Sequence, residues 1–315
     1  MNLLIVGSNF GLIHCKAAIK SKKFKQISIC SPNIDNKKKF KLVARYKDFK
    51  TALDQNKFDM ISIATTPKVQ NEILNYILKK NIFPKLLFLE KPLLNTSIKL
   101  IKKFPKKVLI LTNFIYSFNN IWDIYKKKTN KLEKKIKFFE YRWLFKQAYF
   151  INKIKTWKTN EKIGGGLVNY YLPHAIFNIL NIFNTIKFKK IERKIFYNKN
   201  LILLELIFSL NKVNSKLIIS NKSDENIHLL KTNFNKNYLL LENKTDKWLS
   251  NFKIFSNNKK VFIKKKIVKN NSRINTLTEI YSGLNYFFSK NYVARNKHLT
   301  YKTFKIINHI SKKLK

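Results

Sequence analysis

The chain has 315 residues, enough for two domains that each bury a core of their own. Its 45% of hydrophobic residues is ordinary for a globular protein. No apolar run approaches the roughly 20 residues of a membrane span, and the first one, at residues 3–6, is too short for a secretory signal. The only cysteines are Cys15 and Cys30, so we expect a cytoplasmic protein without disulfides and without a metal site.

The formal net charge of +48 raises the alternative of a polyanion-binding protein, because basic surfaces attract phosphate polymers. The lysines are spread over the whole chain, however, without an arginine-rich arm or a recognition helix. Lys, Asn, Ile, Phe and Tyr are abundant while Gly, Pro, Ala and Arg are scarce, which is the bias of an AT-rich coding sequence. We therefore expect no specific nucleic-acid partner.

Five of the six glycines lie in two short clusters, Gly7 with Gly11 and residues 164–166. The first cluster follows an apolar run at residues 3–6 and precedes a helical pattern at 12–20. A strand that leads into a helix through a glycine turn is typical of dinucleotide-binding folds, where main-chain N–H groups and the helix dipole meet the pyrophosphate. The alternative is a glycine turn without a ligand.

Up to residue 112, short strand-like runs alternate with helical stretches. This alternation predicts a parallel sheet with helices on both faces. The expected strands are 3–6, 26–30, 60–64, 86–89 and 108–111, and the expected helices are 12–20, 48–55, 69–79 and 96–104.

Beyond residue 113 the pattern changes to longer strands separated by turns rich in Asn and Lys, which predicts a mainly antiparallel sheet. A helix at 167–182 interrupts these strands, and two more helices, at 280–289 and 301–314, end the chain. The expected strands are 136–143, 187–197, 201–210, 215–221, 227–234, 238–242 and 261–268.

Four separated stretches carry a resemblance to a known family. The glycine turn is followed by Thr65-Thr66-Pro67 after a strand, by Glu90-Lys91-Pro92 after another strand, and by Gly164-Gly165-Gly166 with His174 downstream. In this order they resemble the Gfo/Idh/MocA family of glucose-fructose oxidoreductases and inositol dehydrogenases, across essentially the whole chain.

The resemblance implies an α/β fold in two domains. Residues 1–115 would form a Rossmann domain with a doubly wound parallel sheet. Residues 116–315 would form an α+β domain with a large, mainly antiparallel open sheet, which binds substrate and forms a homo-oligomer. The final helices are expected to pack back on the N-terminal domain.

The resemblance also implies an oxidoreductase of carbohydrate metabolism that moves hydride between NADP or NAD and a sugar, polyol or nucleotide-sugar. Lys91 would bind the reacting hydroxyl, which suits an ammonium with three donors, and His174 would be the general acid/base, with Tyr170 one helical turn before it. The cofactor would lie against Gly7, Ser8, Asn9, Phe10, Gly11, Ser31, Thr65, Thr66, Pro67, Gln70, Glu90 and Lys91.

Several positions depart from the family pattern. Tyr170 and Phe177 stand where aspartates are usual, and Gln70 where a histidine is usual. Tyrosine can hydrogen-bond an imidazole but cannot balance its charge at neutral pH. Ser31 replaces the acidic residue that would hold an NAD ribose, and Lys37, Lys38 and Lys39 follow it, so NADP is as plausible as NAD. A non-catalytic relative that retains the cofactor is therefore the alternative to an active enzyme.

Overall fold

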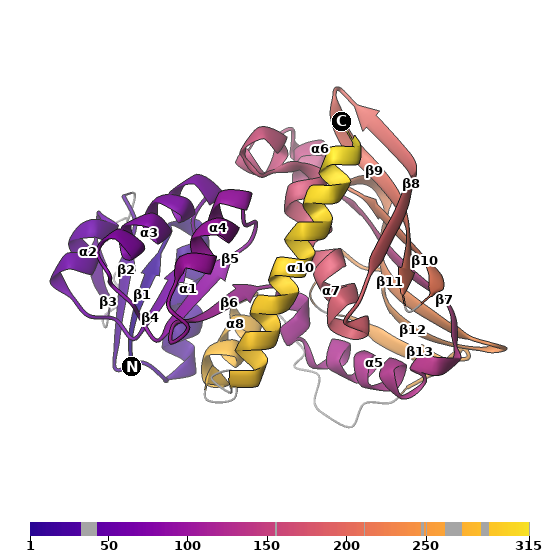
Figure 1. Ribbon diagram of the computed structural model, residues 1–315, viewed down its shortest axis with the longest axis horizontal. Coiled ribbons are helices and arrows are strands. Elements are labelled where there is room, and N and C mark those ends of the chain that lie inside the picture. The colour runs from indigo at the N-terminus through magenta and orange to yellow at the C-terminus, as the bar shows by residue number, and fades with distance from the viewer. Residues whose placement is uncertain are drawn as a thin grey trace. The chain divides into compact units, whose positions relative to one another are not determined.

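A computed structural model describes residues 1–32, 43–154, 156–210, 212–246, 249, 251–261, 273–284 and 290–314. The chain divides into two compact units. Unit 1 comprises Met1–Asn113 with Ser272–Tyr301, and unit 2 comprises Phe114–Asn271 with Lys302–Lys315. Each unit has its own sheet (Figure 1).

Unit 1 is built on a wholly parallel sheet in the order β3-β2-β1-β4-β5-β6. This doubly wound order is that of dinucleotide-binding Rossmann folds, as predicted. Strands β4 and β5 are buried along their whole length, because helices cover both faces of the sheet. The strands are β1 (Asn2–Val6), β2 (Gln26–Cys30), β3 (Val43–Tyr46), β4 (Met60–Ile63), β5 (Leu86–Glu90) and β6 (Leu109–Asn113).

The helices of unit 1 follow their strands as the sequence predicts, in α1 (Asn9–Ser21), α2 (Phe49–Gln55), α3 (Pro67–Lys79) and α4 (Asn95–Lys103). Strand β3 was not predicted, because its four residues are only half-buried and form no apolar run.

The C-terminal part of the chain contributes helix α8 (Arg273–Ser282) to unit 1. This helix packs on α1, where Lys20 Nζ donates to Asn275 Oδ1 at 2.8 Å. Helix α10 (Lys290–Leu314) begins in unit 1, and its Asn296 side chain bonds both backbone groups of Thr112, at 2.9 and 3.3 Å.

Unit 2 holds an eight-stranded sheet in the order β14-β13-β12-β11-β7-β10-β9-β8. Among the described strands only the pair β7–β10 is parallel, which confirms the prediction of a mainly antiparallel sheet. Most of the strand predicted at 261–268 lies outside the described residues. The strands are β7 (Ile136–Lys146), β8 (Lys187–Tyr197), β9 (Asn200–Leu210), β10 (Val213–Ser220), β11 (Lys222–Phe234), β12 (Asn237–Asn243), β13 (Lys253–Ser256) and β14 (Lys259–Lys260).

Two helices, α5 (Asn120–Lys131) and α7 (Leu172–Phe183), cover one face of this sheet (Figure 1). Burial alternates along β9, β10 and β12, as expected for strands with one face against helices and one face open. Helix α7 is buried on nearly all sides and forms the centre of the unit 2 core. No helix among the described residues is long and apolar enough to span a membrane.

Candidate functional site

Gly7 lies directly after β1 and is required by the fold itself. Its φ of 142° is a conformation that L side chains rarely adopt, and a Cβ there would lie 2.3 Å from the carbonyl oxygen of Ala64. Gly11 differs, because a Cβ at this buried position of α1 would meet nothing nearer than Ile5 Cγ2, at 3.6 Å. The fold would therefore accept alanine at position 11 but not at position 7.

Two helix N-termini follow the carboxyl ends of the adjacent strands β1 and β4. Helix α1 begins after Ser8 and helix α3 after Thr66, with neither a side-chain cap hydrogen bond nor an acidic residue in the first turn. Ser8 and Asn9 are exposed, and Thr65 and Thr66 are half-buried. Uncapped N–H groups and the positive end of a helix dipole suit a pyrophosphate. These residues therefore fit the dinucleotide that the sequence predicts.

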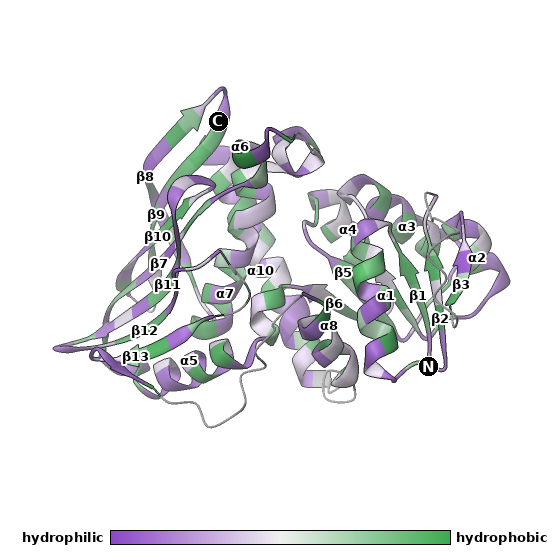
Figure 2. Cartoon of the chain, turned by 180° about the vertical axis from the view of Figure 1, so that it is seen from behind, coloured by the Kyte–Doolittle hydropathy of each residue, from purple (hydrophilic) through white to green (hydrophobic). Residues whose placement is uncertain are grey.

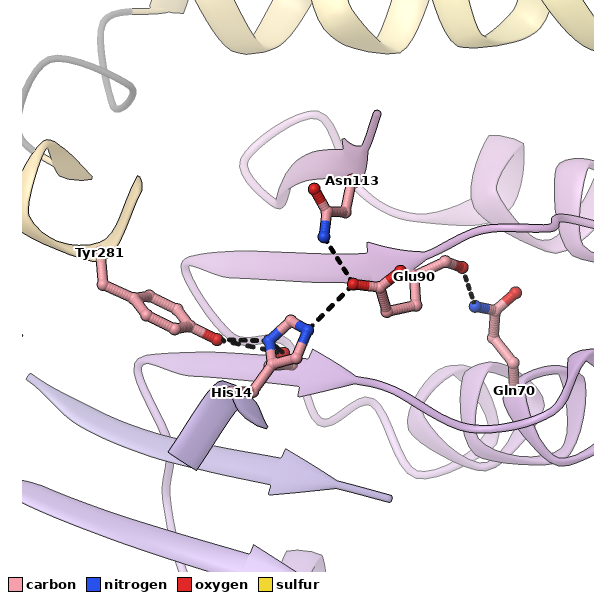
Figure 3. Close-up of polar contacts among 6 residues, drawn as sticks. His14, Gln70, Glu90, Asn113 and Tyr281 are labelled. Carbon is pink, nitrogen blue, oxygen red and sulfur yellow. Dashed lines mark hydrogen bonds and ion pairs between the residues drawn. The ribbon is translucent and has the colours of Figure 1, made fainter. Parts of the chain in front are cut away.

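Glu90, the last residue of β5, is held from three elements (Figure 3). His14 Nε2 of α1 lies 2.9 Å from Glu90 Oε1, and Asn113 Nδ2 at the end of β6 donates to the same oxygen at 2.5 Å. Gln70 Nε2 of α3 donates to the Glu90 backbone carbonyl at 2.7 Å. The carboxylate points into the interior, where it ties α1 and β6 to the end of β5. Its predicted contact with a cofactor remains a prediction.

His14 is supported in turn by two buried hydroxyl groups. Its Nδ1 lies 2.7 Å from Tyr281 Oη of α8 (Figure 3). The same nitrogen lies 3.0 Å from Ser62 Oγ of β4. His14 is 1% exposed and Tyr281 is fully buried. Sequence reasoning missed His14. The signal was a polar residue on the buried face of α1, three positions after Gly11.

The environment of Glu90 keeps its carboxyl group charged. Burial alone would raise the Glu90 pKa, but the hydrogen bond and charge of His14, the Asn113 amide and the charge of Lys91 together hold the pKa below its ordinary value. A buried carboxylate needs such partners, because an isolated charge in the interior is very costly.

Lys91 follows Glu90 at the carboxyl edge of the sheet and is half-buried. The Lys91–Pro92 peptide bond is cis. Strands β4 and β5 run in parallel register, with Ile63 beside Leu89, so Thr65 and Lys91 emerge at the same edge. Ligands of open parallel sheets bind at this edge.

Three further predicted cofactor residues have defined surroundings. Phe10 is half-buried, and the Arg273 guanidinium of α8 lies 4.8 Å from its ring centroid. Pro67 is the first residue of α3 and is buried. Ser31 follows β2 with 2% exposure, and its N–H donates to the Tyr46 carbonyl at 3.0 Å. Lys37, Lys38 and Lys39 lie outside the described residues.

His174 belongs to unit 2, on α7, and is 4% exposed. The rings of Phe114, Tyr116 and Trp143 surround it, with centroids 5.6 to 6.1 Å from that of the imidazole. Phe177, one turn further along α7, stacks on Phe114 with ring centroids 3.9 Å apart. The surroundings of this histidine are therefore aromatic.

The helix predicted over 167–182 is not α-helical throughout. Residues Leu167–Tyr171 form a π-helix, η5, before α7 begins. Tyr170 therefore lies in a wider turn, and the regular α-helical spacing to His174 that the sequence suggested is wrong. Its ring packs on Trp157 and Tyr171, with the Lys158 ammonium 5.6 Å from its centroid. Contact between Tyr170 and His174 remains a prediction.

The second glycine cluster shapes the loop before η5. Gly164 and Gly166 have positive φ angles of 95° and 78°. A Cβ on Gly165 would lie 2.4 Å from the carbonyl oxygen of Trp157. These glycines are explained by packing alone.

A second buried histidine of unit 2, His228 on β11, was also missed. Its ring is stacked on Trp143 with centroids 4.9 Å apart, and its Nε2 lies 2.7 Å from Tyr141 Oη. Burial lowers the His228 pKa to about 3, so this imidazole is neutral at physiological pH. Its side chain faces the helix-covered side of the sheet, and nothing in the sequence distinguished it from a surface histidine.

Residues 1–112 match the model of an oxidoreductase family, described as "NAD-binding Rossmann fold" (GFO_IDH_MocA). The match confirms the resemblance to the Gfo/Idh/MocA family and the prediction of a nicotinamide cofactor. No curated protein sequence matches the chain significantly.

Solved structures are similar to the chain over nearly its full length. A dehydrogenase from Clostridium difficile has a TM-score of 0.73 at 11% identity, covering 99% of both chains. Myo-inositol 2-dehydrogenase from Lactobacillus plantarum has a TM-score of 0.71 at 16% identity, covering 99% of this chain and 96% of that one. Levoglucosan dehydrogenase in complex with NADH and L-sorbose has a TM-score of 0.72 at 12% identity, covering 99% and 97%. At these identities the similarity shows the fold.

We predict that His14→Ala destabilises unit 1 by about 3–5 kcal/mol, because it leaves the Glu90 carboxylate buried without its imidazole partner. The matched control is Lys85→Ala, which breaks the ion pair between Lys85 and Asp59 at a similar distance, 2.8 Å. The Lys85 side chain is 71% exposed, so this change should lower the free energy of unfolding by less than about 1 kcal/mol. Urea unfolding at pH 7 measures both changes.

The cost of His14→Ala should also depend on pH. Because the folded-state pKa of Glu90 is lowered, its stabilisation is present above the unfolded pKa of about 4.3 and is lost as the pH falls through the folded pKa. The difference between wild type and His14→Ala should therefore shrink in acid. Equal effects of His14→Ala and Lys85→Ala at pH 7 would contradict a paired buried charge.

Proposed function

We propose that this chain is an NAD(P)-dependent oxidoreductase that transfers hydride between the nicotinamide cofactor and a sugar, polyol or nucleotide-sugar. The observation that carries the proposal is the shared carboxyl edge of the unit 1 sheet, where the Gly7 turn, the Thr65-Thr66-Pro67 loop and Lys91 end neighbouring strands. The structural similarity to an inositol dehydrogenase and a levoglucosan dehydrogenase supports the substrate class.

In such a reaction different residues of this chain would bind the cofactor, bind the substrate and transfer the proton. The N-termini of α1 and α3 bind the pyrophosphate through main-chain N–H groups. The Lys91 ammonium donates a hydrogen bond to the reacting hydroxyl, and Glu90 keeps a negative charge beside it. The His174 imidazole takes or returns the hydroxyl proton, and the surrounding rings limit access of water. The cofactor, when bound, supplies or accepts the hydride.

Ser31 bears on the choice between NADP and NAD. It ends β2, where an acidic side chain would accept the 2′-hydroxyl hydrogen bond of NAD and repel a 2′-phosphate. With serine there, we propose that NADP binds no worse than NAD.

A non-catalytic relative is the second candidate, and the surroundings of His174 favour it. Phe177 stacks on Phe114, and Tyr170 packs against Trp157, at the two positions where the resemblance implies aspartates. The described α7 and η5 contain no carboxylate that could balance an imidazolium. Such a chain would bind the cofactor without turnover.

A test of activity separates the two candidates. If the chain is an enzyme, His174→Ala should lower kcat by about 10²–10⁴, the usual contribution of general acid/base catalysis, and leave cofactor affinity nearly unchanged. Tyr170→Phe should cost less, because it removes a hydroxyl group and no charge. The control is His298→Ala, at an exposed position of α10, which should have no effect.

The measurement is NAD(P)H absorbance during turnover of a panel of sugars, polyols and nucleotide-sugars. Full activity of His174→Ala would remove this histidine from the mechanism. Cofactor binding without turnover of any member of the panel would favour the non-catalytic relative.

We propose a cytoplasmic protein that forms a homo-oligomer through the open face of the unit 2 sheet. Cys15 and Cys30 are free and buried, and burial raises the pKa of the Cys15 thiol to about 11, so both suit a reducing compartment. The open sheet face carries half-buried apolar side chains, including Ile207, Ile218 and Leu229.

Light scattering tests the assembly. We expect a mass that is a multiple of 37.5 kDa for the wild type, and a smaller mass after Ile207→Lys with Leu229→Lys, because two charges would be buried without partners. A monomeric wild type would contradict the proposed interface.

A further inference from the structure

Exposed large apolar side chains are concentrated in one region of unit 2. Among the described residues six such side chains are exposed, and five come from only two stretches of the chain, 151–163 and 196–197. These five are between 44% and 60% exposed. We define them as the apolar patch: Ile151, Ile154, Ile163, Phe196 and Tyr197. Scattered single residues are normal on a surface, whereas a concentration of this kind marks an interaction site.

The stretches that carry the patch lie side by side. Helix α6 (Ala148–Asn152) contacts the end of β8, where the rings of Phe150 and Tyr197 have centroids 6.2 Å apart. Lys222 Nζ joins them, 5.6 Å from the Phe150 centroid and 3.0 Å from that of Tyr197. Both views show α6 beside the β8–β9 end of the sheet, and Figure 2 colours much of α6 as hydrophobic.

The 3₁₀ helix η4 (Glu161–Ile163) brings the fifth member to the same region. Glu161 accepts a hydrogen bond from the backbone of Leu201, the residue of β9 that pairs with Phe196 of β8. Ile163 ends η4. These contacts connect α6 and η4, the two ends of the segment that carries Ile151, Ile154 and Ile163, to the β8–β9 hairpin that carries Phe196 and Tyr197.

The charge of these segments is almost entirely basic. Residues 148–163 carry four lysines and one glutamate. That glutamate, Glu161, is half-buried, and burial raises its pKa, which favours the neutral form. On β8, Glu192 is paired with Lys190 at 3.0 Å. Exposed lysines accompany the apolar side chains, at positions 153, 162, 194 and 199.

Exposed isoleucine and aromatic side chains among lysines are typical of protein surfaces that lie in a membrane interface. There the apolar side chains enter the boundary between headgroups and acyl chains, aromatic rings lie at headgroup level, and lysines attract anionic lipid. A protein interface would instead be depleted of lysine. We infer that the apolar patch docks unit 2 peripherally on an anionic lipid surface. The net charge of +48 would assist this contact over distances up to the Debye length.

Flotation with lipid vesicles tests this inference at about 0.15 M salt, where long-range attraction is screened. The probes are vesicles of phosphatidylglycerol with phosphatidylcholine and vesicles of phosphatidylcholine alone. The variant Ile151→Ser, Ile154→Ser, Ile163→Ser removes apolar surface and leaves the charge unchanged. The matched control is Leu132→Ser, because Leu132 is the sixth exposed large apolar residue and lies outside the patch, also among lysines.

We expect the wild type and Leu132→Ser to bind the anionic vesicles equally, and the triple variant to bind at least about tenfold more weakly, because burial of each methylene contributes to membrane affinity. Equal binding of the triple variant and wild type would overturn the inference, since the general charge would then suffice. Absence of wild-type binding would also overturn it. So would a smaller mass of the triple variant in light scattering with vesicle binding unchanged, because the patch would then join two copies.

Discussion

The hydrogen bond between His14 and the buried Glu90 carboxylate is the interaction on which the candidate site of unit 1 depends. A carboxylate inside a protein is tolerated only with partners, and Glu90 takes them from α1 and β6. The same contacts set the end of β5, from which Lys91 emerges, relative to the helix that follows the Gly7 turn. Gln70 adds a bond from α3 to the Glu90 carbonyl, and Tyr281 secures His14 from α8. The helices that would bind a pyrophosphate and the lysine that would bind the substrate thus share one buried anchor.

Much of unit 1 could be predicted because a doubly wound sheet leaves clear local signals. Three of its strands, β1, β5 and β6, contain continuous apolar runs, and the glycine turn and the Glu90-Lys91-Pro92 segment mark strand ends. The direction of a side chain at a strand end has no such signal. The inward direction of the Glu90 carboxylate was therefore not predicted, and contact of Glu90 with a cofactor stays a prediction. His14 was missed because its partners are 48 to 267 positions away in the chain.

In unit 2 the alternating pattern of the strands predicted the sheet, but the helices that cover it were harder to predict from the sequence. Helix α5 is rich in lysine and asparagine, and only four of its residues are buried, so its pattern resembles that of a loop. The π-helix before α7 comes directly after the glycine loop, and no residue spacing in the sequence indicated it. As a result His174 was found by its distance from the glycines, while its aromatic surroundings and the neighbouring His228 could be known only from the structure.

The high positive charge and the dinucleotide motifs support different functions, and cofactor binding distinguishes them most directly. Titration of the protein with NADH and NADPH, followed by nicotinamide fluorescence, measures it. We expect saturable binding of both dinucleotides, with NADPH at least as tight as NADH because Ser31 presents no carboxylate to its phosphate. We also expect Gly11→Val to bind them more weakly, because its methyl groups would crowd Ile5 and Ile29 and displace the start of α1. If neither dinucleotide bound at millimolar concentration, the central claim that unit 1 is a working nicotinamide-binding domain would be contradicted.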